Sequence, residues 1–321
     1  MRTADLDLAT LRCEQDGRVL TVRVVAPPFN FMTATMQEDF VRLVAAVETD
    51  GSVGAVIVTG GVPGRYITHF AIADLLHSAD TLPEGLPRPV ASVVVRAVKL
   101  ISTAGGAPAH RLLERTPASS LALLARFHAA CNAVLSSPAV WIAAVDGPCG
   151  GGGLELSTFF DVRLAAPDAR FMLPELTIGL TTTFGGQRLA TLIGPSRALE
   201  LMLEGCAITA AEAQAVGLVS RVVEDDVLAR AQALAARYAR RPRATVAAQK
   251  SIFNDTVSLS ESLTREAVLQ AVGLSSPTTR AALTCWLRDQ DPSGDSTFLT
   301  DPLPWRDGTA LDMNAELPAH A

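Results

Sequence analysis

Apolar and polar residues alternate on both sides of a turn dipeptide near the start of the chain. Thr10–Gln15 and Arg18–Val25 flank Asp16-Gly17, a dipeptide that accepts the positive φ angles of a tight hairpin turn. Pro27-Pro28 follows and ends the pairing, because proline cannot donate a hydrogen bond to a strand ladder. The pattern predicts a β-hairpin.

Helical patterns and continuous apolar runs alternate in the next part of the chain. A helix is expected to begin near Thr35, because Glu38 stands three residues on and completes a capping box. Val53–Thr59 and Trp141–Val145 are short apolar runs, which is typical of strands covered on both faces. A helical pattern over Leu121–Leu135 precedes the second run. This repetition of helix and buried strand indicates an α/β fold.

The pattern becomes helical after about residue 225. The expected helices are Val227–Arg240, Ala244–Phe253, Leu259–Val272 and Thr278–Leu287. The last residues, 291–321, are rich in Pro, Asp and Thr, and we expect a tail there. These shifts divide the chain into a core, 1–225, with a long insertion at about 77–119, a C-terminal helical region, 226–290, and the tail.

The composition excludes several classes of function. The chain has 321 residues, of which 49% are hydrophobic, and a net charge of −6. It can therefore bury a large core, and it lacks the basic surface that binds nucleic acids. No secretion signal and no apolar run of membrane-spanning length are seen, and the five cysteines are scattered as in a protein of a reducing compartment. We expect a cytoplasmic protein that binds neither a membrane nor a metal.

A glycine-rich loop follows the second buried strand. Asp146-Gly147 leads into Gly150–Gly153, and a short helix with Glu155 then begins. The spacing fits neither a P-loop nor a dinucleotide-binding loop, because Glu155 stands where the latter has its last glycine. N–H groups at the start of a helix can bind negative charge. The glycines alone leave two interpretations open, an oxyanion site and a tight turn packed under a helix.

A second carboxylate follows an apolar strand. Pro174-Glu175 comes directly after Phe171-Met172-Leu173, and α/β sheets usually bind their ligands at strand ends. Two carboxylates beside an oxyanion site suit acid–base chemistry on a carbon next to a carbonyl group. The pair Glu155 and Glu175 is therefore the candidate catalytic site.

Further motifs complete a set with these residues. The set consists of Asp146-Gly147, Gly151-Gly152-Gly153, Glu155-Leu156, Phe160-Asp161, Pro174-Glu175, Gly185-Gly186-Gln187-Arg188-Leu189, Leu203-Glu204-Gly205 and Val216-Gly217-Leu218-Val219. It resembles the crotonase (enoyl-CoA hydratase/isomerase) superfamily, over roughly residues 10–255 without the middle stretch. The resemblance implies a crotonase-like ββα spiral core with a C-terminal helical trimerisation region. It also implies an acyl-CoA thioester substrate, no cofactor beyond the coenzyme A of that substrate, and a homotrimer or a hexamer of two trimers.

The resemblance assigns roles to the two acids and to two backbone amides. The thioester oxygen would lie between the N–H groups of Phe70 and Gly152, which stabilise charge as an enolate forms. Glu155 would be the base that activates water, and Glu175 the acid that protonates the α-carbon. Hydratases of the superfamily keep both acids, so the implied activity is the hydration of a 2-trans-enoyl-CoA.

Contacts to coenzyme A are also carried over by position. The resemblance places backbone around Phe29, Ile67 and Phe70 near the cofactor moiety, and Lys250 near its phosphates. The alternative for Lys250 is a solvated lysine on a helix, which is the commoner case.

Two loops depart from the family pattern. His69 stands in place of a glycine, and we interpret it as a packing substitution; Ala71 replaces the usual acid. Thr182-Thr183-Phe184 replaces Pro-Gly-Ala in the loop that positions water in hydratases. The insertion at 77–119 would be a lid, a reshaped acyl pocket or a surface elaboration. Double-bond isomerisation, thioester hydrolysis and non-catalytic acyl-CoA binding are therefore alternatives to hydration.

Overall fold

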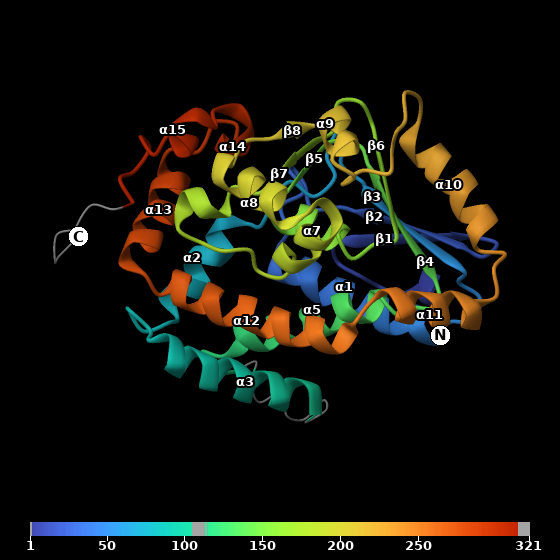
Figure 1. Ribbon diagram of the computed structural model, residues 1–321, viewed down its shortest axis with the longest axis horizontal. Helices are drawn as coiled ribbons and strands as arrows, with labels where there is room; N and C mark the ends of the chain where they lie inside the picture. Colours follow the sequence, from blue (N-terminus) through green and yellow to red (C-terminus); the bar gives the residue numbers. More distant parts are fainter. Residues whose placement is uncertain (1, 105–112, 114, 314–321) are drawn as a thin grey trace.

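The computed structural model describes residues 2–104, 113 and 115–313, and its centre is a six-stranded sheet (Figure 1). The strands, in spatial order, are β1 (Leu11–Asp16), β2 (Val19–Val24), β3 (Ala55–Gly60), β4 (Val140–Val145), β6 (Val162–Ala165) and β9 (Arg221–Val222). The first pair is antiparallel, and all later neighbours are parallel. The α/β class expected from the sequence is confirmed.

The N-terminal hairpin forms where the alternation predicts it. Asp16 pairs with Val19 across the turn, and Gly17 adopts φ 55°. A residue with a Cβ rarely takes that angle, so glycine at this position sets the register of β1 against β2.

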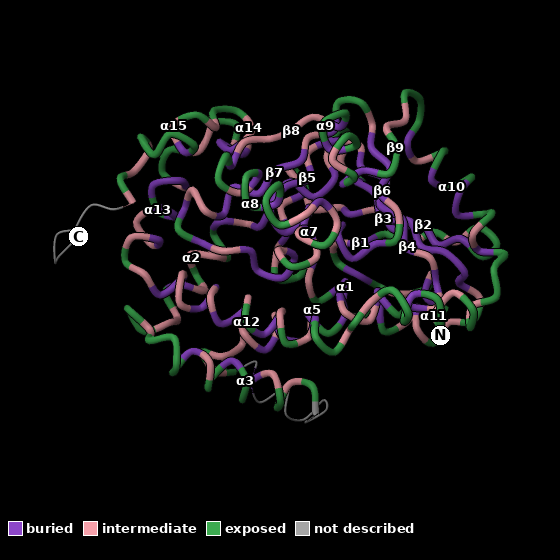
Figure 2. Tube along the Cα trace, in the orientation of Figure 1, coloured by how far each residue is buried: buried purple, intermediate pink, exposed green. Residues whose placement is uncertain are grey.

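Helices cover both faces of the central strands, as their continuous apolar sequence predicts. Alternate side chains of β3 and β4 pack towards α1 (Ala34–Thr49) and α5 (Ser119–Val134), and the others pack towards α10 (Val227–Tyr238). All of β3, and β4 from Trp141 onwards, are therefore buried (Figure 2). This two-sided burial places the core of the protein at β3 and β4.

The first long helix begins one residue earlier than its sequence pattern predicts. The expected capping box at Thr35 and Glu38 is replaced by a cap at Thr33, whose hydroxyl accepts a hydrogen bond from the Met36 amide at 3.2 Å. The backbone of Thr33 is extended, which lets its side chain reach an amide of the first turn.

A small sheet and several short helices lie beside the ends of the central strands. The sheet consists of β5 (Pro148–Gly150), β7 (Arg170–Met172) and β8 (Ile208–Thr209). The helices are η1 (Thr3–Asp5), α6 (Gly152–Ser157), η2 (Glu175–Ile178), α7 (Gly186–Ile193), α8 (Pro195–Glu204) and α9 (Ala210–Ala215). Because β5 and β7 are parallel neighbours, the elements that follow them, α6 and η2, emerge at the same edge.

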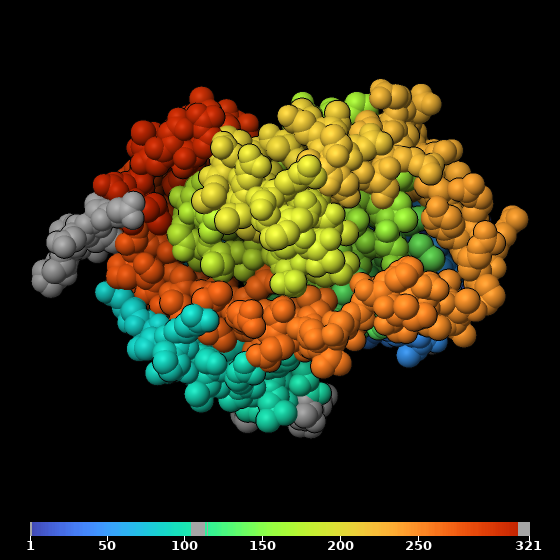
Figure 3. Space-filling model, in the orientation of Figure 1, coloured from blue at the N-terminus to red at the C-terminus, as the bar shows by residue number. Residues whose placement is uncertain are grey.

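The insertion adds helices against the C-terminal region. Its described residues include the end of α2 (Ile72–Asp80) and all of α3 (Arg88–Ala104), while residues 105–112 and 114 lie outside the described part. Val95 of α3 packs with Ala267 and Ala271 of α12 (Thr256–Leu274). In Figures 1 and 3, α3 lies along the outer side of α12 at the lower rim of the molecule.

The C-terminal helices form where helical spacing predicts them. They are α10, α11 (Arg243–Phe253), α12 and α13 (Pro277–Arg288). Within the stretch expected to be a tail, residues 291–313 are described and include α14 (Thr297–Thr300) and α15 (Leu303–Arg306). Phe298 and Trp305 from this stretch are buried against Trp286 of α13. Across the described residues, no helix is both long enough and apolar enough to traverse a lipid bilayer.

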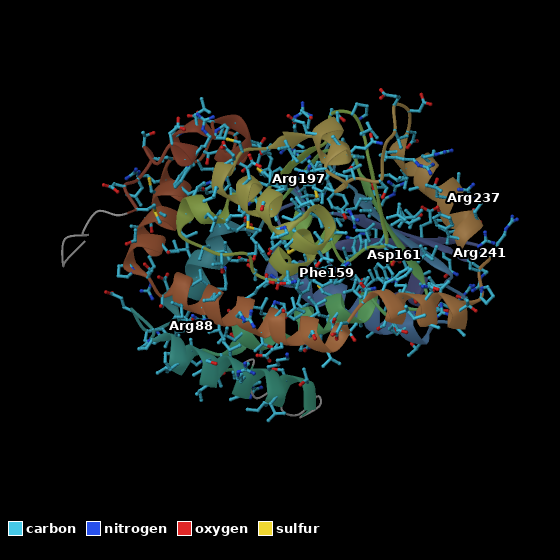
Figure 4. All side chains as sticks on the ribbon, in the orientation of Figure 1. Arg88, Phe159, Asp161, Arg197, Arg237 and Arg241 are labelled. Atoms are coloured by element: carbon cyan, nitrogen blue, oxygen red, sulfur yellow. The ribbon has the colours of Figure 1, made fainter. Side chains whose placement is uncertain are left out.

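A partly buried ion pair fixes α11 to the sheet. The Lys250 ammonium donates to Asp161 Oδ2 at 2.9 Å and to the Ala139 carbonyl oxygen at 3.2 Å. Asp161, which is labelled in Figure 4, also accepts from the Trp141 amide at 2.8 Å. Desolvation on burial lowers the pKa of Lys250, and Asp161 opposes that shift.

We expect Lys250→Met to lower the free energy of unfolding by about 2–3 kcal/mol, because it leaves the Asp161 carboxylate without its cation. The value is at the low end for such pairs, since the Asp161 side chain keeps 23% of its exposure. Urea unfolding measures the change. Arg240→Met, the same kind of replacement at an exposed cation, is the control; an equal loss in both variants would contradict the role of the pair.

Candidate active site

Glu155 is held by the loop that precedes α7. Its side chain is buried on α6, and Oε1 accepts hydrogen bonds from three amides, those of Thr183 at 2.7 Å, Phe184 at 3.1 Å and Gly185 at 3.0 Å. A Cβ on Gly185 would lie only 2.5 Å from the Cβ of Glu155, so glycine is what permits this approach. The second oxygen, Oε2, is buried without a partner among the described residues.

Glu175 lies against the glycine loop. It begins η2, three residues after the end of β7, and 8% of its surface is exposed. A Cβ on Gly151 would lie 2.8 Å from Oε1 of Glu175, and Gly151 has φ 45°. Both its angle and its contact therefore require glycine. The other oxygen, Oε2, is buried and unpartnered among the described residues, as in Glu155.

Burial and mutual repulsion disfavour the charged forms of both acids. Burial, together with the charge of Glu266, raises the pKa of Glu155 to about 7, although its three amide hydrogen bonds act in the opposite direction. Burial and the charge of Glu155 raise the pKa of Glu175 well above its ordinary value. Two carboxyl groups so placed do not ionise together near neutral pH. The arrangement therefore favours one carboxylate and one carboxylic acid.

The two residues predicted to supply the oxyanion amides, Phe70 and Gly152, are in contact. Met32 N–H donates to the His69 carbonyl at 2.7 Å, and Ala71 N–H donates to the Met32 carbonyl at 2.9 Å. The intervening Phe70 N–H points away from this ladder, because successive strand amides alternate in direction. Gly152 is the first residue of α6, where an N–H has no partner within the helix. A Cβ on Gly152 would lie 2.6 Å from the Phe70 ring, so the two residues are in contact.

The His69 side chain is buried among aromatic rings, and both of its ring nitrogens are hydrogen-bonded. Its ring stacks on Phe31 with centroids 4.6 Å apart and meets Trp286 and Phe298 edge-on. Nδ1 lies 2.6 Å from the Phe70 carbonyl oxygen, which can only accept, so Nδ1 carries the hydrogen. The other ring nitrogen, Nε2, then accepts a hydrogen bond from the Ser296 hydroxyl, whose oxygen lies 2.7 Å from it. Burial lowers the pKa of His69 to about 4, and the ring is neutral near pH 7.

An apolar cavity opens beside the amides. This cavity has a volume of about 100 Å³ and lies between α2, α5 and α12. Its lining includes Met32, Phe70, Leu75, Leu121, Leu124, Thr183, Gln270 and Leu274. A smaller cavity next to Glu175 shares Phe70, Leu75, Thr183 and Gln270 with it. Ser78, Thr81, Leu82 and Pro117, from the insertion, also line the larger cavity, so the insertion shapes this pocket.

The residues expected to contact coenzyme A are not all brought to this site. Ile67 is buried and its carbonyl accepts from Gly150 N–H at 3.2 Å, next to the glycine loop. The Phe29 ring lies under the Arg65 guanidinium, 5.3 Å from its centre. Lys250, in contrast, is bound to Asp161 at the amino end of β6, whereas Glu155 follows the carboxyl end of β4. Its ammonium is committed to that internal pair, which does not fit the expected phosphate contact.

Three polar residues near the glutamates were not identified from the sequence. Glu266 of α12 accepts from Thr182 Oγ1 at 3.0 Å and from Gly186 N–H at 3.1 Å. His128 Nε2 of α5 lies 3.1 Å from the Thr183 carbonyl oxygen. Gln270 of α12 is 4% exposed. The only signal in the sequence is that His128 and Gln270 interrupt apolar stripes of predicted helices, and it does not specify their partners.

Comparison with known proteins gives the family. The model of the family "Enoyl-CoA hydratase/isomerase" matches residues 90–282. A "Probable enoyl-CoA hydratase" of Bacillus subtilis (strain 168) is 30% identical over 292 residues, which are 89% of this chain and 98% of that protein. A "Short-chain-enoyl-CoA hydratase" of Clostridioides difficile is 48% identical over 94 residues, 29% of this chain and 60% of that protein.

Solved structures show the same fold. An enoyl-CoA hydratase from Bacillus halodurans superposes with a TM-score of 0.71 at 17% identity, covering 86% of this chain and 99% of that one. An enoyl-CoA hydratase/isomerase from Mycobacterium paratuberculosis gives 0.67 at 20% identity, with 87% and 99% covered. The crotonase-like fold that the sequence motifs imply is thus confirmed, and the chain belongs to the enoyl-CoA hydratase/isomerase family.

Proposed function

We propose that this protein is an enoyl-CoA hydratase, which adds water across the double bond of a 2-trans-enoyl-CoA. The observation that carries the proposal is the pair of buried acids, Glu155 and Glu175, each with one oxygen that has no partner among the described residues. Glu155 lies on the helix that follows the glycine loop, and Glu175 lies against Gly151 of that loop. Hydration needs a base and an acid at once, whereas isomerisation needs only one group that moves a proton. The names of the relatives support the same activity.

The proposed reaction uses the two protonation states that burial favours. Glu155, as a carboxylate, takes a proton from water while the water oxygen bonds to C3. Electrons of the double bond move towards the thioester, and Glu175 delivers its proton to C2. The proton then returns from Glu155 to Glu175, which restores both groups. This exchange is supported by the pKa of Glu155, which burial raises to about 7, and by the raised pKa of Glu175, which keeps that group protonated.

Charge on the thioester oxygen would be stabilised by the Phe70 and Gly152 amides. A buried pair of donors is effective because the donors are already oriented when charge develops, and each contributes on the order of 10²–10³ in rate. The apolar cavity next to Phe70 would take the acyl chain. No group beyond the coenzyme A of the substrate is required, and in this proposal the active assembly is a trimer or a pair of trimers.

Double-bond isomerisation is the second candidate. Thr183 N–H, which stands in the loop that holds water in hydratases, is bound to Glu155 instead. An enzyme that has lost the means to hold water would still form the enolate and could return the proton to another carbon.

Product masses separate these activities, and glutamine variants test the acids. With crotonyl-CoA, we expect a mass gain of one water; an unchanged mass with a shifted double bond would indicate isomerisation. Glu155→Gln and Glu175→Gln are each expected to lose about 10²–10⁴-fold in kcat, the usual contribution of a positioned acid or base. Glu200→Gln, at an exposed position of α8, is the matched control. Normal turnover in either site variant would refute its role.

Glu155→Gln should keep its fold, and the pH dependence of its stability tests this. Because the pKa of Glu155 is raised from 4.5 to about 7 in the folded protein, the native state binds more protons than the unfolded one between these values, and its stability falls as pH rises through them. Glu155→Gln removes that fall. We expect its Tm at pH 8 to equal or exceed that of the wild type, as measured by calorimetry; a lower Tm would mean that the hydrogen bonds to the carboxylate outweigh its burial.

The charge of Glu266 should set the lower pH limit of activity. Glu155 must be ionised to act as a base, so kcat/KM is expected to fall as pH drops below about 7. Glu266→Gln removes a neighbouring charge that raises this pKa, while glutamine can still accept from Thr182 and Gly186. The acid limb of the kcat/KM profile should therefore move to lower pH. A limb that stays in place, or moves to higher pH, would contradict the coupling.

A further inference from the structure

Four buried polar atoms of the site have no hydrogen-bond partner among the described residues. They are Oε2 of Glu155, Oε2 of Glu175, Oγ1 of Thr183 and Oε1 of Gln270. Three belong to residues that line the smaller cavity, and the fourth belongs to Glu155, which binds the Thr183 amide. Burying a polar atom without a partner is unfavourable, and unsatisfied atoms are few in native proteins. Several together therefore indicate a place where a polar molecule binds.

Gln270 is placed to face that molecule. It belongs to the buried side of α12, where its neighbours Ala267, Ala271 and Leu274 are apolar, and only 4% of it is exposed. It lines both the larger apolar cavity and the smaller one next to Glu175. Its carboxamide thus lies where the two cavities meet.

Thr183 shares this position and is held rigidly there. Its N–H donates to Glu155 at 2.7 Å, and its carbonyl accepts from His128 at 3.1 Å. The side-chain hydroxyl is the remaining polar group, and the residue lines both cavities together with Gln270. Thr183 therefore connects the Gln270 carboxamide to Glu155.

The loop before α7 leaves the reacting water short of a donor. The amides of Thr183, Phe184 and Gly185 all donate to a single oxygen of Glu155. A buried water is stable with two to four polar partners. Glu155, as a carboxylate, can accept a hydrogen of the water but cannot donate to its oxygen, and in the proposed reaction the one proton of Glu175 is directed at C2.

From this geometry, and resting on the proposed hydratase function, we propose that Gln270 is a water-positioning residue. The unpartnered Thr183 hydroxyl donates to the oxygen of the reacting water, and the unpartnered Oε1 of Gln270 accepts one of its hydrogens. Oε2 of Glu155 accepts the hydrogen that is transferred. A side chain of the loop and one from α12 thereby make the contacts that the loop backbone does not make.

Gln270→Met tests the assignment, because methionine keeps the length of the side chain and removes the amide. With crotonyl-CoA, which has no polar group on its acyl chain, we expect kcat for hydration to fall on the order of 10²-fold, the cost of a misplaced reactant. KM should change by no more than about threefold, since methionine preserves the length of the side chain that Gln270 contributes to the cavity wall. Gln214→Met, the same change at an exposed glutamine of α9, should match the wild type.

A second readout separates positioning of water from general damage to the site. Exchange of the C2 hydrogen of butyryl-CoA in D₂O requires an enolate but no added water. Gln270→Met should retain this exchange within about threefold while losing hydration. Equal losses in both reactions, a rise in KM alone, or unchanged hydration would each overturn the assignment. Absence of hydration in the wild-type protein would instead refute the proposed function, whatever Gln270→Met does.

Discussion

The constraint on which the site depends is the burial of two carboxyl groups in one apolar interior. Each loses hydration, and each is disfavoured further when the other is charged. Compensation is larger on one side: three amides of a neighbouring loop donate to Oε1 of Glu155, whereas only a backbone hydrogen bond at Glu175 itself lowers the pKa of that group. This asymmetry makes Glu155 the group that ionises first. Acid and base are thereby distinguished by their surroundings, although they are the same residue type.

Holding Glu155 requires a rigid loop, and helices distant in sequence supply that rigidity. Glu266 of α12 binds the start of α7, and His128 of α5 binds the carbonyl of Thr183. The loop is thus fixed at both ends of the segment that donates to Glu155. Since α3 packs on α12 and α5, the insertion stabilises the same helices. Its contribution to the site is partly direct, through the cavity wall, and partly through this support.

The parts of the structure that local patterns specify could be predicted from the sequence. The hairpin at Gly17, the buried strands β3 and β4 and the C-terminal helices follow from periods of two or 3.6 residues and from turn chemistry. The two glutamates and the amides of Phe70 and Gly152 were predicted through family motifs. The pairing of Lys250 with Asp161 could not be, because it joins residues 89 positions apart, and helical spacing alone does not tell a buried lysine from a solvated one. Gln270 was missed for a related reason: its place in an apolar stripe predicts burial, but only the fold shows that it faces a cavity.

His69 shows how a departure from a motif is accommodated by a distant segment. Replacing a glycine with histidine in the loop before Phe70 adds a ring that must be buried, and the C-terminal residues provide the surface for it. Phe298 packs against the ring, Ser296 donates to Nε2, and Asp295 pairs with Arg65 at 2.5 Å at the start of the same loop. Because the ring donates from Nδ1 to the Phe70 carbonyl, it fixes the orientation of the residue whose N–H is one of the two proposed oxyanion donors. The conformational freedom that glycine would give this loop is thus replaced by the contacts of His69 with Ser296 and Phe298. Through these contacts, the described part of the C-terminal stretch supports the candidate active site.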